Sequence, residues 1–219
     1  KKILLINIES ESEAILINKI AKKMNKEVSV GFRLNPNVDA KTHRKISTGK
    51  AENKFGLSIQ NFKKFYKDIK ELKNLKVEAI SVHIGSQILS DKPYKKTLDV
   101  LEKVINDLNL KLKYVDLGGG FGIKYEKRDK LINLKNYSKQ VQKFKKRINC
   151  NIIFEPGRSL IGNAGVLVTK IQYIKKGYKK DFIILDAGMN DFMRPALYDA
   201  KHNIIPVNNI NKKSTKTIE

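Results

Sequence analysis

The amino-acid sequence predicts an α/β protein: part of a TIM-type (β/α) barrel, followed by the start of an antiparallel β domain. In residues 1–158, short apolar runs alternate five times with segments of helical periodicity, as expected for parallel strands joined by right-handed helical crossovers. Several of these runs end in glycine and polar residues, and a barrel gathers its functional side chains at that rim. After residue 158 the helical periodicity stops, while strand-like runs continue.

The first strand is expected at residues 3–8, which are mostly apolar. Ser10 and Glu13 form a capping-box pattern, which predicts the start of a helix. The second strand is expected at residues 28–34, and the Asn-Pro-Asn sequence of residues 35–37 ends it. The helix between these strands has an apolar face at steps of three and four residues, made of Ala14, Ile17, Ala21 and Met24.

Residues 38–56 show little periodicity and many polar side chains, which predicts a long loop. A long loop on the rim of a barrel is usually functional or mobile. His43 lies in this loop without a cysteine or a second histidine at metal-ligand spacing, so we expect no metal site.

Three more strands are expected at residues 77–84, in the stretch 114–122 and at residues 151–154. The second of them is a short apolar run that ends in three glycines. An amphipathic helix is expected before or after each strand. The apolar faces of these helices, which predict core packing, are formed by Phe62, Phe65, Tyr66, Ile69, Leu72, Tyr94, Leu98, Leu101, Ile105, Leu108, Tyr137, Val141, Phe144 and Ile148.

The pattern changes near Ser159, where we expect a second domain to begin. Residues 165–173 and 181–185 are strand-like, and the lysine-rich segment 175–180 between them indicates a hairpin turn. The predicted division is therefore a cofactor-binding partial barrel at residues 1–158 and part of an antiparallel β domain at residues 159–219.

The composition is that of a globular protein with a strong positive charge. The 219 residues are 41% hydrophobic, and 45 Lys and Arg against 22 Asp and Glu give a formal charge of +23. Because lysines are spread over every predicted helix and arginines are few, we expect no nucleic acid as the physiological partner. A run of about 18 apolar residues is absent, so no membrane span is expected. The single cysteine, Cys150, excludes an internal disulfide framework and reads as a buried small hydrophobe.

Three strand ends carry the residues from which chemistry is expected. The glycines of the stretch 114–122 make either a tight turn or a row of N–H groups that binds an anion such as phosphate. His83 is either a core histidine or a stacking or proton-transfer residue, and Ser86 adds a hydroxyl beside it. Glu155 either pairs locally with Arg158 or faces a cationic ring nitrogen, in which case Arg158 faces an anion.

Together these groups suit pyridoxal phosphate. The glycine turn and Ser86 would hold the phosphate, and an acid at the pyridine nitrogen would keep that nitrogen protonated. The ring could then accept electrons from a developing carbanion, and the protein would orient and tune it.

The chain closely resembles the diaminopimelate decarboxylases, within the alanine-racemase-like group of pyridoxal-phosphate enzymes. Its histidine, glycine and glutamate motifs are shared with ornithine and arginine decarboxylases, whereas the 35–56 loop and the 194–198 motif are more specific. The matching segments are residues 35–43, 46–49, 53–56, 82–87, 116–122, 155–159, 186–191 and 193–198.

The resemblance implies that His83 stacks on the cofactor ring and that Glu155 pairs with the ring nitrogen; these are the expected catalytic residues. It also implies that Arg158, Arg194 and Tyr198 hold a carboxylate of the substrate, meso-diaminopimelate, which loses CO2 to give L-lysine. A cytoplasmic homodimer is implied as well. The resemblance places around the cofactor, besides His83 and Glu155, the residues Ser86, Gly119, Gly120, Pro156, Gly157 and Arg158.

Two motifs of the family are absent from this sequence: the segment with the Schiff-base lysine and the Cys-Glu-Ser segment with the proton donor. Cys150 stands between two asparagines and does not match the second. The chain therefore resembles an internal fragment, about strands 4–8 of 8, because five strands cannot close a barrel. The alternatives are a related ornithine or arginine decarboxylase, a non-catalytic pyridoxal-phosphate-binding protein, and a basic protein associated with nucleic acid.

Overall fold

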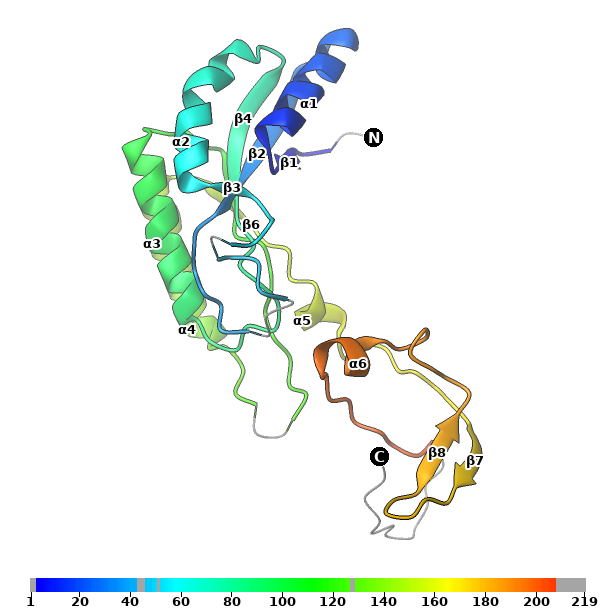
Figure 1. Cartoon of the computed structure of the whole chain (residues 1–219). Helices are drawn as coiled ribbons and strands as arrows, with labels where there is room; N and C mark the ends of the chain where they lie inside the picture. Colours follow the sequence, from blue (N-terminus) through cyan, green and yellow to red (C-terminus); the bar gives the residue numbers. More distant parts are fainter. Residues whose placement is uncertain (1–2, 43–45, 51, 127–128, 208–219) are drawn as a thin grey trace. The chain divides into compact units, whose positions relative to one another are not determined.

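The computed structural model describes residues 3–42, 46–50, 52–126 and 129–207 (Figure 1). The chain divides into two compact units, and each is described by itself. Unit 1 comprises Lys1–Ile123 and Lys130–Gly162, and unit 2 comprises Lys124–Asp129 and Asn163–Glu219. His43 lies outside the described residues.

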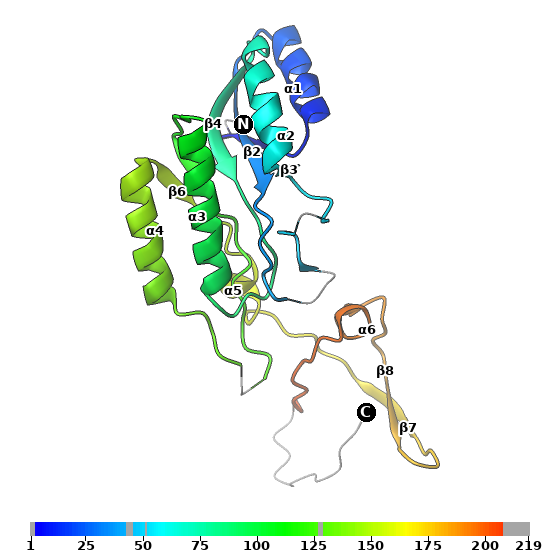
Figure 2. The ribbon, with the colours of Figure 1, turned by 60° about the vertical axis from the view of Figure 1, so that its left-hand side comes forward.

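Unit 1 is built on a parallel sheet whose spatial order follows the chain. Its strands run β1-β2-β4-β5-β6, and a two-residue strand, β3, pairs with the end of β2. Sequential order with right-handed crossovers puts the connecting helices on one face of the sheet; Figure 2 shows α3 and α4 side by side there. The strands are β1 (Ile6–Ile8), β2 (Val28–Asn35), β3 (Leu57–Ser58), β4 (Leu75–Ser81), β5 (Tyr114–Asp116) and β6 (Asn151–Ile153).

Three helices of unit 1 begin at side-chain caps that the sequence supplies: Ser10, Ser58 and Asn133. Helix α1 starts after Ser10, whose Oγ accepts from the Glu13 N–H at 3.1 Å. The second half of the expected capping box differs, since the Glu13 carboxylate accepts from the Glu9 N–H at 2.7 Å and not from that of Ser10. The helices are α1 (Glu11–Lys23), α2 (Ile59–Asp68) with a 3₁₀ turn η2 (Ile69–Glu71), α3 (Lys92–Asp107), α4 (Leu134–Ile148) and α5 (Arg158–Ile161).

The core lies between the sheet and its helices. Phe32 of β2 and Phe62 of α2 are fully buried, with ring centroids 5.6 Å apart. In a second aromatic contact, Tyr94 of α3 packs against Tyr137 of α4, with ring centroids 4.9 Å apart. The aromatic stripe of α2 is thus core packing, as predicted. Met24 is the exception among the expected apolar faces, because it caps the end of α1 and is 58% exposed.

Cys150 is buried, and burial raises the pKa of its thiol. This agrees with its interpretation as a small hydrophobe. Within the described residues, none of the helices combines the length and the apolar character that crossing a bilayer requires.

Unit 2 contains a short antiparallel hairpin and one helical turn. Strand β7 (Ile171–Lys175) pairs with β8 (Phe182–Leu185), and the Lys176–Asp181 ion pair at 3.0 Å lies at the turn. The predicted antiparallel pairing is therefore present. The first strand was expected at 165–173; pairing with β8 begins only at Ile171, so β7 is displaced toward the turn. Helix α6 (Arg194–Tyr198) was not expected.

Candidate functional site

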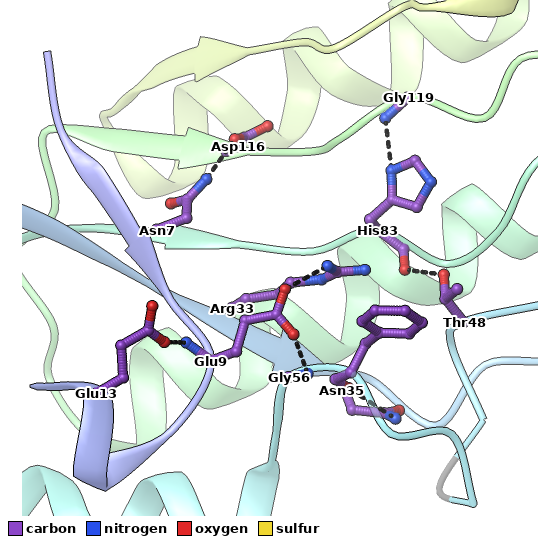
Figure 3. Close-up of polar contacts among 11 residues, drawn as sticks. Asn7, Glu9, Glu13, Arg33, Asn35, Thr48, Gly56, His83, Asp116 and Gly119 are labelled. Atoms are coloured by element: carbon purple, nitrogen blue, oxygen red, sulfur yellow. Dashed lines mark hydrogen bonds and ion pairs between the residues drawn. The ribbon is translucent and has the colours of Figure 1, made fainter. Parts of the chain in front are cut away.

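A cavity of about 380 Å³ opens at the carboxyl ends of the parallel strands of unit 1. Every major strand contributes to its wall, either from its last residues or from the turn that follows it. Figure 3 shows several of these side chains and their polar contacts. The residues that line the cavity are Asn7, Glu9, Arg33, Ser81, Val82, His83, Asp116 and Glu155.

The triple-glycine turn after β5 is packed between the turns that follow β4 and β6. A Cβ on Gly119 would lie 1.8 Å from the backbone oxygen of Glu155. A Cβ on Gly120, whose φ is +90°, would lie 2.1 Å from the backbone oxygen of Gly85. Glycine is needed here because three stretches of backbone meet without room for a side chain. This contact brings His83, the glycine turn and Glu155 together.

Most N–H groups of the glycine turn already have partners inside the protein. The Gly118 N–H donates to Asp116 Oδ1 at 2.9 Å, and the Gly119 N–H donates to His83 Nδ1 at 3.3 Å. Among the described residues, only the N–H of Gly120 in the triple glycine has no acceptor. The glycines of this turn therefore serve chiefly to let three backbone segments pack closely. Of the row of N–H groups expected to bind an anion, only that of Gly120 has no acceptor among the described residues.

His83 is held as a neutral imidazole at the edge of the cavity. Its Nδ1 accepts from Gly119, so the proton of the neutral ring lies on Nε2 (Figure 3). Burial lowers the pKa of His83, the Arg33 charge lowers it further, and Asp116 opposes both. The Thr48 hydroxyl, from the predicted rim loop, donates to the His83 backbone oxygen at 2.6 Å. A half-buried imidazole that lines a cavity favours the functional interpretation over the core one.

Glu155 supplies a carboxylate that makes no hydrogen bond or ion pair with any residue that the structure describes. Desolvation raises its pKa, and the Asp116 charge adds to this, whereas Arg33 opposes it. The alternative of a local pair with Arg158 is not found, since the Arg158 guanidinium donates to Gln87 Oε1 at 3.0 Å. The Glu155 carboxylate is thus available to a ligand.

The other residues expected near the cofactor lie on the same turns. Ser86 follows His83 by three residues, and its N–H donates to Ile46 at 3.1 Å. Gly157, with φ of +39°, precedes the short helix α5, and Pro156 accepts from the Ser159 hydroxyl at 2.7 Å. Their roles toward the cofactor stay predictions.

Tyr94 of α3 holds the glycine turn through a hydrogen bond. Its buried hydroxyl donates to the Gly119 backbone oxygen at 2.8 Å. We expect Tyr94→Phe to lower the free energy of unfolding by about 1–3 kcal/mol, because a buried carbonyl loses its donor. Tyr137→Phe is the matched control: its hydroxyl makes no hydrogen bond within the described residues, and we expect a change below about 0.5 kcal/mol. Equal effects of the two substitutions in urea unfolding would contradict this assignment.

Sequence reasoning missed five polar residues of the cavity: Asn7, Glu9, Arg33, Ser81 and Asp116. Asn7 donates to Asp116 Oδ2 at 3.1 Å, and Arg33 Nη1 lies 2.6 Å from Glu9 Oε1. A signal was present for each of them. Asn7, Glu9 and Arg33 stand in or directly after the first two strands, which lack a glycine motif at their ends. Ser81 and Asp116 are the last residues of β4 and β5, just before the motifs that the sequence analysis singled out.

Arg194 and Tyr198, expected to bind the substrate, lie on α6 in unit 2. The Arg194 guanidinium donates to the Tyr125 hydroxyl at 3.2 Å, and its central carbon is 5.7 Å from the ring centroids of both Tyr125 and Tyr198. Two aromatic faces thus hold this cation in place.

The described residues fit a protonated, phosphorylated pyridine ring. The unpaired Glu155 carboxylate suits a ring N–H⁺, and a neutral imidazole can lie against a cationic ring without charge repulsion. The free Gly120 N–H is a donor for an anionic oxygen.

Comparison with known proteins agrees with this fit. Residues 1–162 match the family of pyridoxal-dependent decarboxylases, in its pyridoxal binding domain. Diaminopimelate decarboxylase of Aquifex aeolicus is 42% identical over 215 residues, which are 97% of this chain and 51% of that protein. The corresponding protein of Neisseria meningitidis serogroup A is 43% identical over 90% of this chain and 49% of its own length.

Solved structures give the same result. Diaminopimelate decarboxylase from Helicobacter pylori, complexed with L-lysine, superimposes with a TM-score of 0.88 at 37% identity, over 95% of this chain and 53% of that one. Diaminopimelate decarboxylase from M. jannaschii, also in complex with L-lysine, superimposes with a TM-score of 0.77 at 38% identity, over 90% of this chain and 48% of that one. The chain spans about half the length of the curated relatives it matches. It belongs to the pyridoxal-dependent decarboxylases, and its cofactor is pyridoxal phosphate.

Proposed function

We propose that the whole protein removes CO2 from meso-diaminopimelate to give L-lysine, a step of lysine biosynthesis. The observation that carries the proposal is the Glu155 carboxylate, which lies at the same cavity as a neutral His83 and pairs with none of the described residues. The substrate is supported by relatives that are about 42% identical and are named diaminopimelate decarboxylases.

Each residue has a role in this proposal. Glu155 accepts a hydrogen bond from the protonated ring nitrogen and so keeps the ring cationic, and His83 packs against the ring face. Ser86 and the Gly120 N–H take the phosphate, with Gly119, Pro156, Gly157 and Arg158 beside them. When bound, pyridoxal phosphate takes up the electron pair left by the departing carboxylate.

The finer architecture is part of the same proposal. Residues 1–158 supply about strands 4–8 of an eight-stranded barrel, and residues 159–219 supply part of an antiparallel β domain. Within the described residues, β1 and β6 each pair on one side only, which leaves two edges for the missing strands. The lysine that carries the cofactor and the proton-donor cysteine then lie outside this sequence, and the whole protein acts as a cytoplasmic homodimer.

The test is CO2 release by the whole protein with added pyridoxal phosphate. We expect turnover of meso-diaminopimelate and little release from ornithine, arginine or lysine. Preferred turnover of ornithine or arginine would assign the protein to a related decarboxylase. Cofactor binding without turnover of any of the four would indicate a non-catalytic binding protein.

Arg194→Ala tests the proposed carboxylate contact. Hydrogen bonds to charged groups contribute about 1.5–3 kcal/mol each, so we expect KM for meso-diaminopimelate to rise about 10- to 100-fold. The value of kcat should change much less. Arg147→Ala is the control, since Arg147 pairs with Glu102 at 2.5 Å on the outer helices. An unchanged KM in Arg194→Ala would remove this residue from the substrate site.

A further inference from the structure

Three carboxylates and a single arginine line the cavity within the described residues. Asp116 accepts hydrogen bonds from Asn7 and from the Gly118 N–H, Glu9 pairs with Arg33, and Glu155 has no partner in the part of the chain that the structure describes. We propose that Glu9 is a positioning residue that keeps the Arg33 guanidinium away from Glu155, so that Glu155 stays free for the ring nitrogen of the cofactor. This inference rests on the role proposed above for Glu155.

Arg33 is fixed on two sides. Its Nη1 lies 2.6 Å from Glu9 Oε1, and its central guanidinium carbon lies 5.0 Å from the centroid of the Phe55 ring. Its side chain is 19% exposed. A guanidinium held between a carboxylate and an aromatic face has little freedom to turn toward another acid.

Glu9 is in turn fixed by the backbone. Its Oε2 accepts from the Gly56 N–H at 3.0 Å, at the end of the long rim loop (Figure 3). Its own N–H donates to Glu13 Oε2 at 2.7 Å, at the first turn of α1. Both oxygens of the Glu9 carboxylate are therefore used, one on Arg33 and one on the loop, and the position of Arg33 is tied to that of the rim loop.

In this arrangement the Arg33 charge acts on Glu155 and His83 through space, while the Glu155 carboxylate stays available to a ligand. From its place in the cavity wall, the Arg33 charge lowers the pKa of Glu155 against the effect of burial, and it also lowers the pKa of His83. Both effects favour an ionised acid and a neutral imidazole. A direct Arg33–Glu155 pair would instead occupy the carboxylate and place a second cation beside the ring nitrogen.

Glu9→Gln in the whole protein is the test. Glutamine keeps an oxygen for the Gly56 N–H but loses the charge that holds Arg33. We expect the dissociation constant for pyridoxal phosphate, measured by titration of the apoprotein, to rise about 10-fold or more, as for the loss of a hydrogen bond to a charged group. Glu102→Gln is the matched control, because it also removes a carboxylate from an arginine pair, on the outer helices, and it should bind as the wild type does.

The double variant Glu9→Gln/Arg33→Gln separates positioning from a structural role. If the harm comes from Arg33 capturing Glu155, the double variant should bind pyridoxal phosphate more tightly than Glu9→Gln alone. A crystal structure of the Glu9→Gln apoprotein should show Arg33 at ion-pair distance from Glu155. Glu9→Asp, which keeps the charge, should bind pyridoxal phosphate more tightly than Glu9→Gln. If the glutamine variant does not fold, Glu9→Asp is compared with the wild type, whose affinity it should approach.

The outcomes distinguish this inference from the proposed function. Wild-type protein that binds no pyridoxal phosphate would overturn the role of Glu155 itself. Wild-type binding together with equal losses in Glu9→Gln, Glu9→Asp and the double variant would overturn the positioning role of Glu9 alone. Undiminished binding by Glu9→Gln would do the same.

Discussion

Replacing Glu155 by Gln in the whole protein is expected to lower kcat for the proposed substrate, meso-diaminopimelate, by about 100- to 1,000-fold, the usual cost of removing one preorganised electrostatic group from an active site. Gln keeps the shape of the side chain but carries no charge to hold a protonated ring nitrogen. The measurement is steady-state CO2 release at saturating cofactor. Glu102→Gln, which changes an exposed ion pair between α3 and α4, should leave kcat unchanged.

The pH dependence of cofactor binding provides a second readout for Glu155. Burial and the neighbouring Asp116 raise the pKa of Glu155 above the ordinary value of 4.5. The affinity of the wild-type protein should therefore fall, relative to that of Glu155→Gln, as the pH drops toward the pKa of this carboxyl. A ratio of the two affinities that stays constant with pH would show that ionisation of Glu155 does not contribute to binding.

The same raised pKa makes Glu155 unfavourable for the stability of the apoprotein. Because the folded state binds the proton more tightly than the unfolded state, the free energy of unfolding falls as the pH rises from 4.5 through the folded pKa. Glu155→Gln should thus be more stable than the wild-type apoprotein at neutral pH, with the difference vanishing below about pH 4.5. A gain in stability together with a loss of activity is the result expected of a functional acid and not of a structural one.

The elements of unit 1 followed from periodicity because each strand and helix buries one apolar face. The strands around Val30, Ile80 and Val115 are fully buried at these positions, and the helices pack on them as the sequence predicts. The elements that were not predicted are short: β3 has two residues, α5 four and α6 five. Segments of that length are too short for a hydrophobic pattern to repeat, and tertiary contacts fix them.

The site was predictable in part for a similar reason. His83 and Glu155 stand out because each is a polar residue at the end of an apolar run, two positions before a glycine. Arg33 does not, since it lies inside a strand whose register places its side chain at the cavity. The use of the glycine N–H groups could not be read from the sequence either, because it depends on how closely three turns approach one another.

Gly119→Ala is expected to have the largest effect on stability. A Cβ at this position would lie 1.8 Å from the Glu155 backbone oxygen and 2.8 Å from the carbon of the same carbonyl. Relief requires backbone movement, because no flexible side chain is involved. We expect the free energy of unfolding to fall by about 3 kcal/mol or more, at the upper end of overpacking effects.

Gly165→Ala is the matched control for this prediction, because a Cβ there meets no atom within 4 Å. Its effect on urea unfolding should stay within about 0.5 kcal/mol. Because the methyl group of Gly119→Ala would push apart the turns that carry His83 and Glu155, cofactor affinity should fall along with stability, even under conditions where the variant remains folded. If Gly119→Ala proved as stable as Gly165→Ala and bound the cofactor normally, the three turns could not meet at this glycine, and the cavity described above would lose its structural basis.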